Sequence, residues 1–278
     1  MTDHYAVFGN PIGLSKSPRI HALFAKQTGQ DISYQAILAP TDGFAAALHA
    51  FATTKGGSAR GANVTVPFKE EAFRLATQRT ARAEAAGAVN TLSFEQDAMV
   101  GDNTDGAGLV RDLKHNLGCD PAGRRILLLG AGGAARGVIL PLLLEQPVEL
   151  VIANRTEETA ARLALEFSRV PGCAVAVKPD GMGYTGLAGR SFDLVINATS
   201  AGLSGAVLPL PTCVFAPRCV AYEMVYGRET AFMSQARNAG ARVADGLGML
   251  VEQAAEAFFI WRGVRPHTAP VLAALKEK

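Results

Sequence analysis

RILLLGAGGAARGVILPLLLEQPVELVIANR, residues 125–155, carries the strongest structural signal in this 278-residue chain. Ile126–Leu129 is an apolar run typical of a strand that is buried on both faces of a parallel sheet. Gly130, Gly132 and Ala135 then follow the G-x-G-x-x-G/A pattern. Its first glycine permits a tight turn, the second lets backbone amides approach a pyrophosphate, and the third small residue lets a helix pack on its strand. The stretch predicts a Rossmann-type dinucleotide-binding domain.

The sequence around this glycine loop also bears on the cofactor. Ala134–Leu144 is expected to be a helix and Val148–Ala153 a second strand. In NAD enzymes an acidic residue at the tip of that second strand holds the ribose 2′-hydroxyl. Here the tip is Asn154-Arg155-Thr156, which has no carboxylate to repel a 2′-phosphate, and the Arg155 guanidinium can pair with one. The sequence therefore favours NADP over NAD. The alternatives are a Rossmann-like domain without a nucleotide, or a surface arginine at a strand end.

Composition and charge exclude several classes of protein. The net charge is +2 and no dense Lys/Arg block occurs, so we expect no nucleic-acid partner. No apolar run approaches the ~20 residues that span a bilayer, and the N-terminus lacks a signal-peptide pattern. The five histidines are scattered and the cysteines lack metal-type spacing, so we expect no metal site. Free buried thiols in a cytosolic protein are the expectation for Cys119, Cys173, Cys213 and Cys219.

The glycine loop lies in the middle of the chain, so a separate domain is expected ahead of it. In that first part we expect strands at residues 5–8, 34–38, 61–66, 89–94 and 98–101, the last two paired around a turn at 95–97. Helices are expected at residues 18–29, 44–51 and 69–77. This order predicts an α/β domain with a mainly parallel sheet. A helix at 105–117 leads into the nucleotide domain. Its later strands are expected at 174–177, 192–197, 219–224 and 243–244, before a long helix at 249–261 and a short terminal helix.

Polar residues of the first domain form three clusters that could do chemistry. Ser15 and Ser17 lie in a loop after the first strand, where serines usually serve turns and caps. Thr65 and Lys69 flank Pro67 at the carboxyl end of a strand, which is where open α/β sheets bind ligands. Lys69 could equally be a solvated residue at a helix start.

The third cluster is Asn90 together with Asn103-Thr104-Asp105. Asp105 could merely cap the helix that follows it. A lysine and an aspartate that face one pocket would suit proton transfer coupled to hydride transfer, because the carboxylate would hold and orient the amine.

Taken together, these segments resemble the shikimate dehydrogenase family nearly from end to end. The blocks that carry the resemblance are Gly9-Asn10-Pro11-Ile12, Ser15-Lys16-Ser17-Pro18, Asn63-Val64-Thr65-Val66-Pro67-Phe68-Lys69, Gly87-Ala88-Val89-Asn90-Thr91, Gly101-Asp102-Asn103-Thr104-Asp105-Gly106, Gly130 to Ala134, Asn154-Arg155-Thr156, Asn197-Ala198-Thr199-Ser200, Met224-Val225-Tyr226 and Gly246-Leu247-Gly248-Met249-Leu250 with Gln253. Each block is modest, but their order and spacing together are highly specific.

The resemblance implies the reversible reduction of 3-dehydroshikimate to shikimate by NADPH, in the chorismate and aromatic amino-acid pathway of the cytoplasm. It implies that Lys69 is the acid/base residue and Asp105 its partner, both in contact with substrate. The implied substrate-binding residues are Ser15, Ser17, Thr65, Asn90, Tyr226 and Gln253. The implied NADP-binding residues are Gly130, Ala131, Gly132, Gly133, Ala134, Asn154, Arg155, Thr156, Thr159, Met224 and Gly246.

The resemblance also implies a domain plan. The C-terminal helices would return to the first domain, so that residues 1–104 and 250–278 form the substrate-binding domain and residues 105–249 the Rossmann-type NADP domain, with a cleft between them. A monomer or homodimer is expected.

Three positions depart from the family pattern. Leu14 replaces a histidine and Glu223 replaces an aspartate, and we expect little effect from either. At Thr159, members of the family carry a second arginine for the 2′-phosphate. With Arg155 alone, discrimination against NAD is expected to be weaker, although Arg162, one turn further along the helix, offers a second cation.

Three other functions stay open at this point. A quinate/shikimate dehydrogenase that uses NAD or both cofactors is the nearest, and Arg155 argues against it. A nucleotide sensor without activity would not need Lys69 and Asp105. A methylene-tetrahydrofolate-type dehydrogenase shares the two-domain plan, but the loop with Ser15 and Ser17 suits a polyhydroxylated acid better than a folate.

Overall fold

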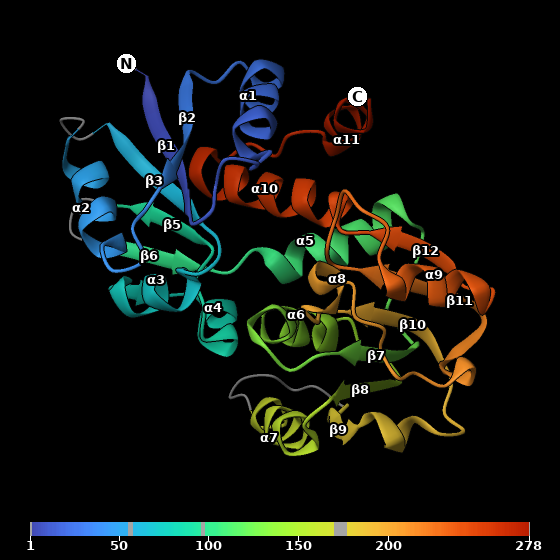
Figure 1. The fold of residues 1–278 in the computed structure, drawn as a ribbon. Helices are drawn as coiled ribbons and strands as arrows, with labels where there is room; N and C mark the ends of the chain where they lie inside the picture. Colours follow the sequence, from blue (N-terminus) through green and yellow to red (C-terminus); the bar gives the residue numbers. More distant parts are fainter. Residues whose placement is uncertain (1, 55–57, 96–97, 170–176, 278) are drawn as a thin grey trace. The chain divides into compact units, whose positions relative to one another are not determined.

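The computed structural model describes residues 2–54, 58–95, 98–169 and 177–277, and the chain divides into two compact units (Figure 1). Unit 1 comprises Met1–Gly108 and Leu250–Lys278, and unit 2 comprises Leu109–Met249. The first boundary falls inside α5 (Asp105–Arg111), slightly beyond the expected boundary at residue 104. The second falls inside α10 (Leu247–Arg262). Each unit is an α/β structure with a sheet of its own.

Unit 1 is built on a six-stranded sheet in the order β2-β1-β3-β5-β6-β4. Its strands are β1 (Asp3–Gly9), β2 (Ile32–Leu38), β3 (Ala59–Val64), β4 (Gln78–Arg79), β5 (Thr91–Phe94) and β6 (Met99–Asp102). β1 pairs in parallel with β2 and β3, and β4 pairs in parallel with β6. β5 runs antiparallel to β3 and β6, since the short connection to β6 permits only a reversal. The sheet is mainly parallel, as expected.

The helices of unit 1 include the two at the C-terminus of the chain. They are α1 (Ser17–Thr28), α2 (Phe44–Thr54), α3 (Lys69–Leu75), α4 (Ala81–Ala86), α10 and α11 (Thr268–Lys276). α11 lies beside α1 (Figure 1), where Arg19 donates a hydrogen bond to the Ala274 carbonyl at 2.9 Å. The C-terminal helices therefore return to the first part of the chain. The sequence patterns missed β4 and α4, because neither is long enough to display a period.

An ion-pair network joins α4, β6 and α10 inside unit 1. The Arg82 guanidinium donates to both carboxylate oxygens of Asp102, at 2.6 and 2.7 Å, and to Glu256 Oε1 at 3.1 Å. Glu256 also accepts a hydrogen bond from Arg265. Burial acts to raise the pKa of Asp102, but the hydrogen bonds and charge of Arg82 outweigh it and hold that pKa below its usual value.

The substitution Arg82→Met is expected to lower the free energy of unfolding by roughly 3 kcal/mol near pH 7, because Asp102 would stay buried without its cation. The folded-state pKa of Asp102 lies below its unfolded value of about 4. Its contribution is therefore present above the unfolded pKa and is lost as the pH falls through the folded pKa, so the difference between wild type and variant should shrink in acid. Urea unfolding, followed by fluorescence of the single tryptophan Trp261, measures this difference.

The matched control for this measurement is Arg60→Met, since Arg60 is an exposed arginine whose ion pair with Asp3 should contribute little. A loss of stability in Arg82→Met that did not change with pH would contradict the assignment to Asp102.

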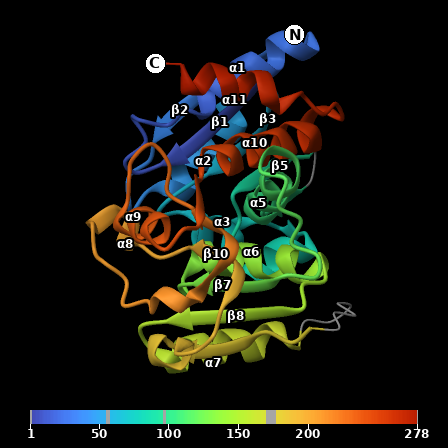
Figure 2. The ribbon, with the colours of Figure 1, turned by 90° about the vertical axis from the view of Figure 1, so that its right-hand side faces the viewer.

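Unit 2 is built on a six-stranded sheet in the order β12-β11-β10-β7-β8-β9, and every pairing in it is parallel. Its strands are β7 (Arg125–Leu129), β8 (Glu149–Asn154), β9 (Asp180–Gly183), β10 (Phe192–Asn197), β11 (Phe215–Glu223) and β12 (Arg242–Asp245). The central strands β10, β7 and β8 lie side by side in Figure 2. This order, with the glycine loop after a central strand, is the Rossmann-type arrangement that the sequence predicts.

The helical segments of unit 2 alternate with these strands. They are η1 (Asp112–Asn116, a π-helix that continues α5), α6 (Gly133–Leu144), α7 (Glu157–Phe167), η2 (Tyr184–Leu187), α8 (Ala201–Ser204), η3 (Thr212–Val214) and α9 (Ala231–Asn238). The strand expected at 174–177 falls on residues of which 174–176 lie outside the described part of the chain. β9 is the edge strand that pairs with β8. It was not predicted from the sequence, because its Asp-Gly-Met-Gly sequence lacks β-branched residues.

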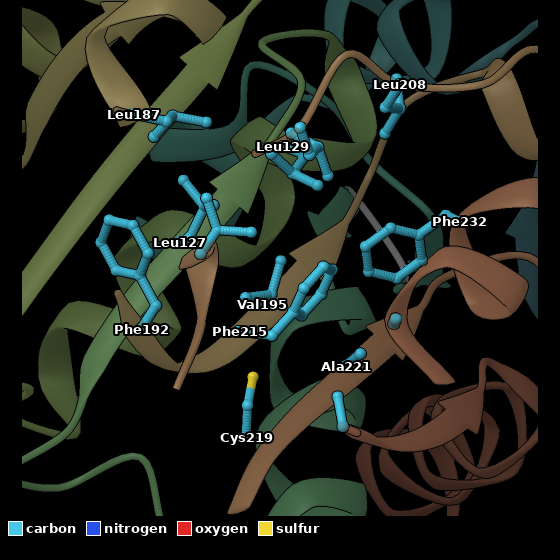
Figure 3. Close-up of a cluster of buried hydrophobic side chains, with 14 of the residues drawn as sticks. Leu127, Leu129, Leu187, Phe192, Val195, Leu208, Phe215, Cys219, Ala221 and Phe232 are labelled. Carbon is cyan, nitrogen blue, oxygen red and sulfur yellow. The ribbon is translucent and has the colours of Figure 1, made fainter. Parts of the chain in front are cut away.

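The core of unit 2 is a buried apolar cluster on one face of this sheet (Figure 3). Leu127 and Leu129 of β7 contribute to it, as does Val195 of β10. They share a face because side chains two residues apart on a strand point the same way. Ile126 and Leu128, which point to the other face, are also buried, so both faces are covered.

The prediction that the cysteines are free buried thiols is only partly confirmed. Cys119 and Cys219 are buried free thiols, and Cys219 lies within the apolar cluster in Figure 3. Cys213, expected to be buried, is exposed, because only Val214 of the short η3 turn faces the core. Cys173 lies outside the described residues.

Two features are absent from the described part of the chain. In the described ranges, every helix is too short or too polar to cross a bilayer. The same residues contain no group of three or more His, Cys, Asp or Glu side chains that could hold a metal ion.

Candidate active site

Lys69 and Asp105 meet in unit 1, although they are far apart in the sequence. Lys69 begins α3 and Asp105 begins α5, and Lys69 Nζ lies 2.6 Å from Asp105 Oδ2. The Lys69 side chain is 29% exposed and that of Asp105 is 14% exposed. The ammonium group is therefore held by a largely buried carboxylate while it remains within reach of a ligand.

Asn90 holds the other oxygen of Asp105. Asn90 Nδ2 donates to Asp105 Oδ1 at 2.7 Å. The orientation of this amide is clear, because Asn90 Oδ1 accepts the backbone N–H of Thr104 at 2.9 Å, and that group can only donate. Each carboxylate oxygen of Asp105 thus has its own donor. Because the Asp105 carboxylate bonds to Lys69 and Asn90, helix capping is not the role of this side chain.

Gln253, on α10, completes this group of polar side chains. Its Oε1 lies 3.4 Å from Asn90 Nδ2 and 3.3 Å from Thr104 Oγ1, while its Nε2 donates to the Leu250 carbonyl. The structure therefore brings four predicted site residues together. Thr104, which links Asn90 to Gln253, was noted in the sequence only as a neighbour of Asp105.

Ser15, Ser17 and Thr65 lie at the same edge of the sheet as this group. Ser15 and Ser17 follow β1, and Thr65 follows β3, which is parallel to β1. β3 ends at Val64, earlier than expected, so Thr65 leaves the strand and its N–H donates to the Phe8 carbonyl at 2.9 Å. Because the carboxyl ends of parallel strands meet at one edge, residues distant in sequence gather there.

Local hydrogen bonds shape the loop between β1 and α1, where the Ser15 N–H donates to the Ile12 carbonyl at 3.0 Å. The Ser17 N–H donates to Ser15 Oγ at 3.3 Å, and Ser17 itself is buried. Leu14, which stands where the family carries a histidine, is 95% exposed. Its side chain contributes nothing to the packing of unit 1, so the departure at this position leaves the two serines undisturbed.

A partly buried network of polar side chains lies next to Asn90, and it was not predicted from the sequence. Tyr34 donates to Asn63 Oδ1 at 2.7 Å, and Asn63 Nδ2 donates to the Asn90 carbonyl and to Thr91 Oγ1, both at 3.1 Å. The ring of His21 stacks on Tyr34 with centroids 4.1 Å apart. Burial lowers the pKa of His21 to about 3, so this ring is neutral near pH 7. The available signal was Asn63, a polar residue between the apolar residues Ala62 and Val64 of an expected strand.

The glycine loop of unit 2 has room for a phosphate group. Gly130 has φ of 104°, a conformation that L side chains rarely adopt. A Cβ added at Gly132 or Gly133 would meet no atom within 4 Å, so the loop faces open space. α6 begins at Gly133 without a side-chain cap, which leaves the amides of its first turn for an anion. Ala131 lies within this loop and Ala134 in the first turn of α6, so the five residues predicted to bind the pyrophosphate are consecutive.

The tip of β8 presents Arg155 to solvent. Asn154 Nδ2 donates to the Thr156 carbonyl at 3.0 Å and shapes the turn. The Thr159 N–H donates to the Thr156 carbonyl at 3.2 Å, in the first turn of α7. Arg155 makes no ion pair with the described residues, so its charge is available to a phosphate.

Three further predicted residues lie near the ends of β11 and β12. Met224 and Tyr226 follow β11 in unit 2, and Gly246 follows β12. A Cβ on Gly246 would lie 2.2 Å from the Met224 carbonyl oxygen, so only glycine permits this approach. Tyr226 therefore belongs to a different unit from the other predicted substrate residues. Burial raises its pKa, so the phenol stays protonated near neutral pH.

Glu223, the substitution for aspartate, has a complete set of partners. Its carboxylate is fully buried and accepts from Asn197 Nδ2 at 2.7 Å, Thr230 Oγ1 at 2.9 Å and the Val225 N–H at 3.1 Å. The longer side chain is therefore accommodated next to Met224.

Comparison with known proteins covers both units. Residues 7–92 match the family described as the shikimate dehydrogenase substrate binding domain. Residues 112–203 match the family described as shikimate / quinate 5-dehydrogenase, and residues 246–276 match the shikimate 5′-dehydrogenase C-terminal domain.

Among curated relatives, the chain is 60% identical over 280 residues to a protein of Dechloromonas aromatica named shikimate dehydrogenase (NADP(+)), with 100% of this chain and 99% of the relative covered. Among solved structures, it is similar to the Ael1 enzyme from Pseudomonas putida, with 47% identity, a TM-score of 0.91 and coverage of 99% and 98%. It is also similar to shikimate 5-dehydrogenase from Thermus thermophilus in complex with NADP(H) and shikimate, with 32% identity, a TM-score of 0.85 and 99% of both chains covered.

Proposed function

Because the chain belongs to the shikimate dehydrogenase family, we propose that Lys69, held by Asp105, is the acid/base group of its reaction. The reaction is the reversible NADPH-dependent reduction of 3-dehydroshikimate to shikimate. The observation that carries the proposal is the 2.6 Å contact between Lys69 Nζ and Asp105 Oδ2 at the ligand-binding edge of the sheet. The lysine gives a proton to the substrate oxygen in reduction and takes it back in oxidation.

Unit 1 is proposed to bind the substrate. Shikimate is small, anionic and dense in hydroxyl groups, and each hydroxyl needs a hydrogen-bond partner when water is displaced. The proposed partners in this unit are Ser15, Ser17, Thr65, Asn90 and Gln253, and Tyr226 of unit 2 remains a predicted substrate residue. Such a site discriminates against analogues that lack a hydroxyl, because its own buried polar groups would be left unpaired.

Unit 2 is proposed to bind NADP. When bound, the cofactor supplies the hydride. Gly130, Gly132 and Gly133 would face the pyrophosphate, and support for this is the open space at Gly132 and Gly133. Arg155 would pair with the 2′-phosphate, with Asn154, Thr156 and Thr159 around it, while Met224 and Gly246 would line the rest of the site.

Oxidation of four substrate and cofactor pairs, followed by absorbance of the reduced cofactor, tests this function. With shikimate, quinate, NADP and NAD combined, kcat/KM is expected to be highest for shikimate with NADP, by at least about tenfold over quinate. The quinate/shikimate alternative is not favoured, since the curated relatives are named for NADP and shikimate. A preference for quinate with NAD would restore that alternative. Tight NADPH binding without turnover would instead indicate a nucleotide sensor.

A cytoplasmic location and a monomeric or homodimeric state complete the proposal. The thiols of Cys119, Cys213 and Cys219 are free, which supports a reducing compartment.

A further inference from the structure

A cavity of about 500 Å³ lies in unit 2 at the edge of the sheet where the parallel strands begin. Arg124, Arg218 and Arg242 are among the residues that line it. Arg124 directly precedes β7, Arg218 is in the first half of β11, and Arg242 begins β12 (Figure 1). The loop at Gly130 follows the other end of β7, so the cavity and the proposed nucleotide site lie at opposite edges of the same sheet.

The three arginines are not balanced by the acidic residue in the cavity wall. That residue is Asp193, and it is already paired with Arg125. Asp193 Oδ2 accepts from the Arg125 N–H at 2.9 Å and from its Nε at 3.2 Å, while Oδ1 accepts from Nη2 at 2.9 Å. These hydrogen bonds hold the pKa of Asp193 below its usual value, so its single negative charge is matched by Arg125.

The hydrogen bonds of the lining arginines go to neutral groups. Arg124 Nε donates to the Asp120 carbonyl at 2.6 Å, and Arg242 Nη2 donates to the Leu117 carbonyl. With the residues that the structure describes, Arg218 forms neither a side-chain hydrogen bond nor an ion pair. Within the described part of the chain, three guanidinium charges therefore border one cavity without carboxylate partners, although the net charge of the chain is only +2.

The backbone of β11 is distorted where it presents Arg218. Phe192 pairs with Phe215 and Leu194 pairs with Val220, so Ala216–Cys219 stand opposite a single residue of β10. Arg218 has φ of 66°, in the left-handed backbone region that residues other than glycine and asparagine rarely adopt. Bulges of this kind redirect a side chain out of a ladder and are frequent next to binding sites.

We propose that this cavity binds a small polyanion that carries two or more phosphate or carboxylate groups. The guanidinium fork matches the oxygens of both groups in a bidentate geometry. A volume of about 500 Å³ lies in the range of small-molecule sites and exceeds what a single inorganic phosphate requires. The buried thiol of Cys119, another lining residue, has a pKa raised by burial and so adds no negative charge near neutral pH.

Calorimetric titration with pyrophosphate, repeated with citrate at equal ionic strength, tests the proposal. The protein is first saturated with NADP, so that the nucleotide site is filled and any further binding comes from elsewhere. Saturable binding of pyrophosphate or citrate is expected. Arg218→Asn, which keeps a residue suited to positive φ, and Arg242→Gln are each expected to raise Kd by roughly ten- to a hundredfold.

The matched control is Arg169→Ala, which removes an equal charge from an exposed arginine of unit 2 outside the cavity wall. Its Kd should equal that of the wild type, and near-ultraviolet circular dichroism checks that all variants are folded. The proposal is overturned if neither anion binds to the NADP-saturated protein. It is also overturned if Arg218→Asn and Arg242→Gln, both folded, bind as tightly as Arg169→Ala.

Discussion

Replacing Lys69 with alanine is expected to lower kcat by roughly a thousandfold while the fold is retained. The lysine side chain is 29% exposed at the start of α3, and alanine favours a helix there, so little packing is lost. The ammonium is expected to act on the substrate oxygen mainly in the transition state, so KM for NADPH should change little. Steady-state kinetics measures both constants, and circular dichroism checks the fold.

Two comparisons sharpen this result. Lys26→Ala, at an exposed lysine in the last turn of α1, should leave kcat unchanged. Adding Asp105→Asn to Lys69→Ala should cost little more than Lys69→Ala alone, because residues that act as a unit are not additive. Near-normal turnover in folded Lys69→Ala would remove the acid/base role. Strictly multiplicative effects in the double variant would show that Asp105 acts independently of the lysine.

Arg155→Ala is expected to raise KM for NADPH by roughly ten- to a hundredfold and to change KM for NADH little. A charge-assisted hydrogen bond contributes about 1.5–3 kcal/mol, and NADH lacks the 2′-phosphate that would receive it. The rise in KM for NADPH should come from the loss of this one side chain, because position 159 holds threonine rather than a second arginine. Initial rates with both cofactors measure the two KM values.

The control for this substitution is again Arg169→Ala, near the other end of α7, which should leave both cofactor constants unchanged. Equal increases in KM for NADPH and NADH would exclude a 2′-phosphate role for Arg155. They would indicate instead that the arginine shapes the tip of β8 for any dinucleotide.

Much of the fold could be predicted because its signals are local. The apolar run before Gly130 and the helix after it appear in the structure as β7 and α6, within one residue of the expected bounds. Elements without such signals were missed, as β4 and β9 illustrate, since they are held by their neighbours in the sheet rather than by their own periodicity. The antiparallel pairing of β5 with β6 could be predicted from the short turn between them, whereas the position of β5 beside β3 could not.

The candidate site could likewise be predicted only in part from the sequence. Residue type and position at strand ends were enough to select Lys69 and Asp105 as candidates, because a ligand site in an α/β sheet lies beyond the carboxyl ends of strands. The sequence could not separate these roles from a solvated helix start and a helix cap. That choice came from the 2.6 Å contact between the two side chains and from Asn90, which occupies the remaining oxygen of Asp105.

Sequence alone was sufficient for the class of each domain, the nucleotide loop and the preference for a 2′-phosphate, since each depends on a few neighbouring residues. Tertiary structure alone decided which polar side chains share hydrogen bonds, including the network of Tyr34 and Asn63. It also decided that Arg124, Arg218 and Arg242 border one cavity. The physical reason is that strand order and register bring distant residues to one edge of a sheet, and neither can be read from local periodicity.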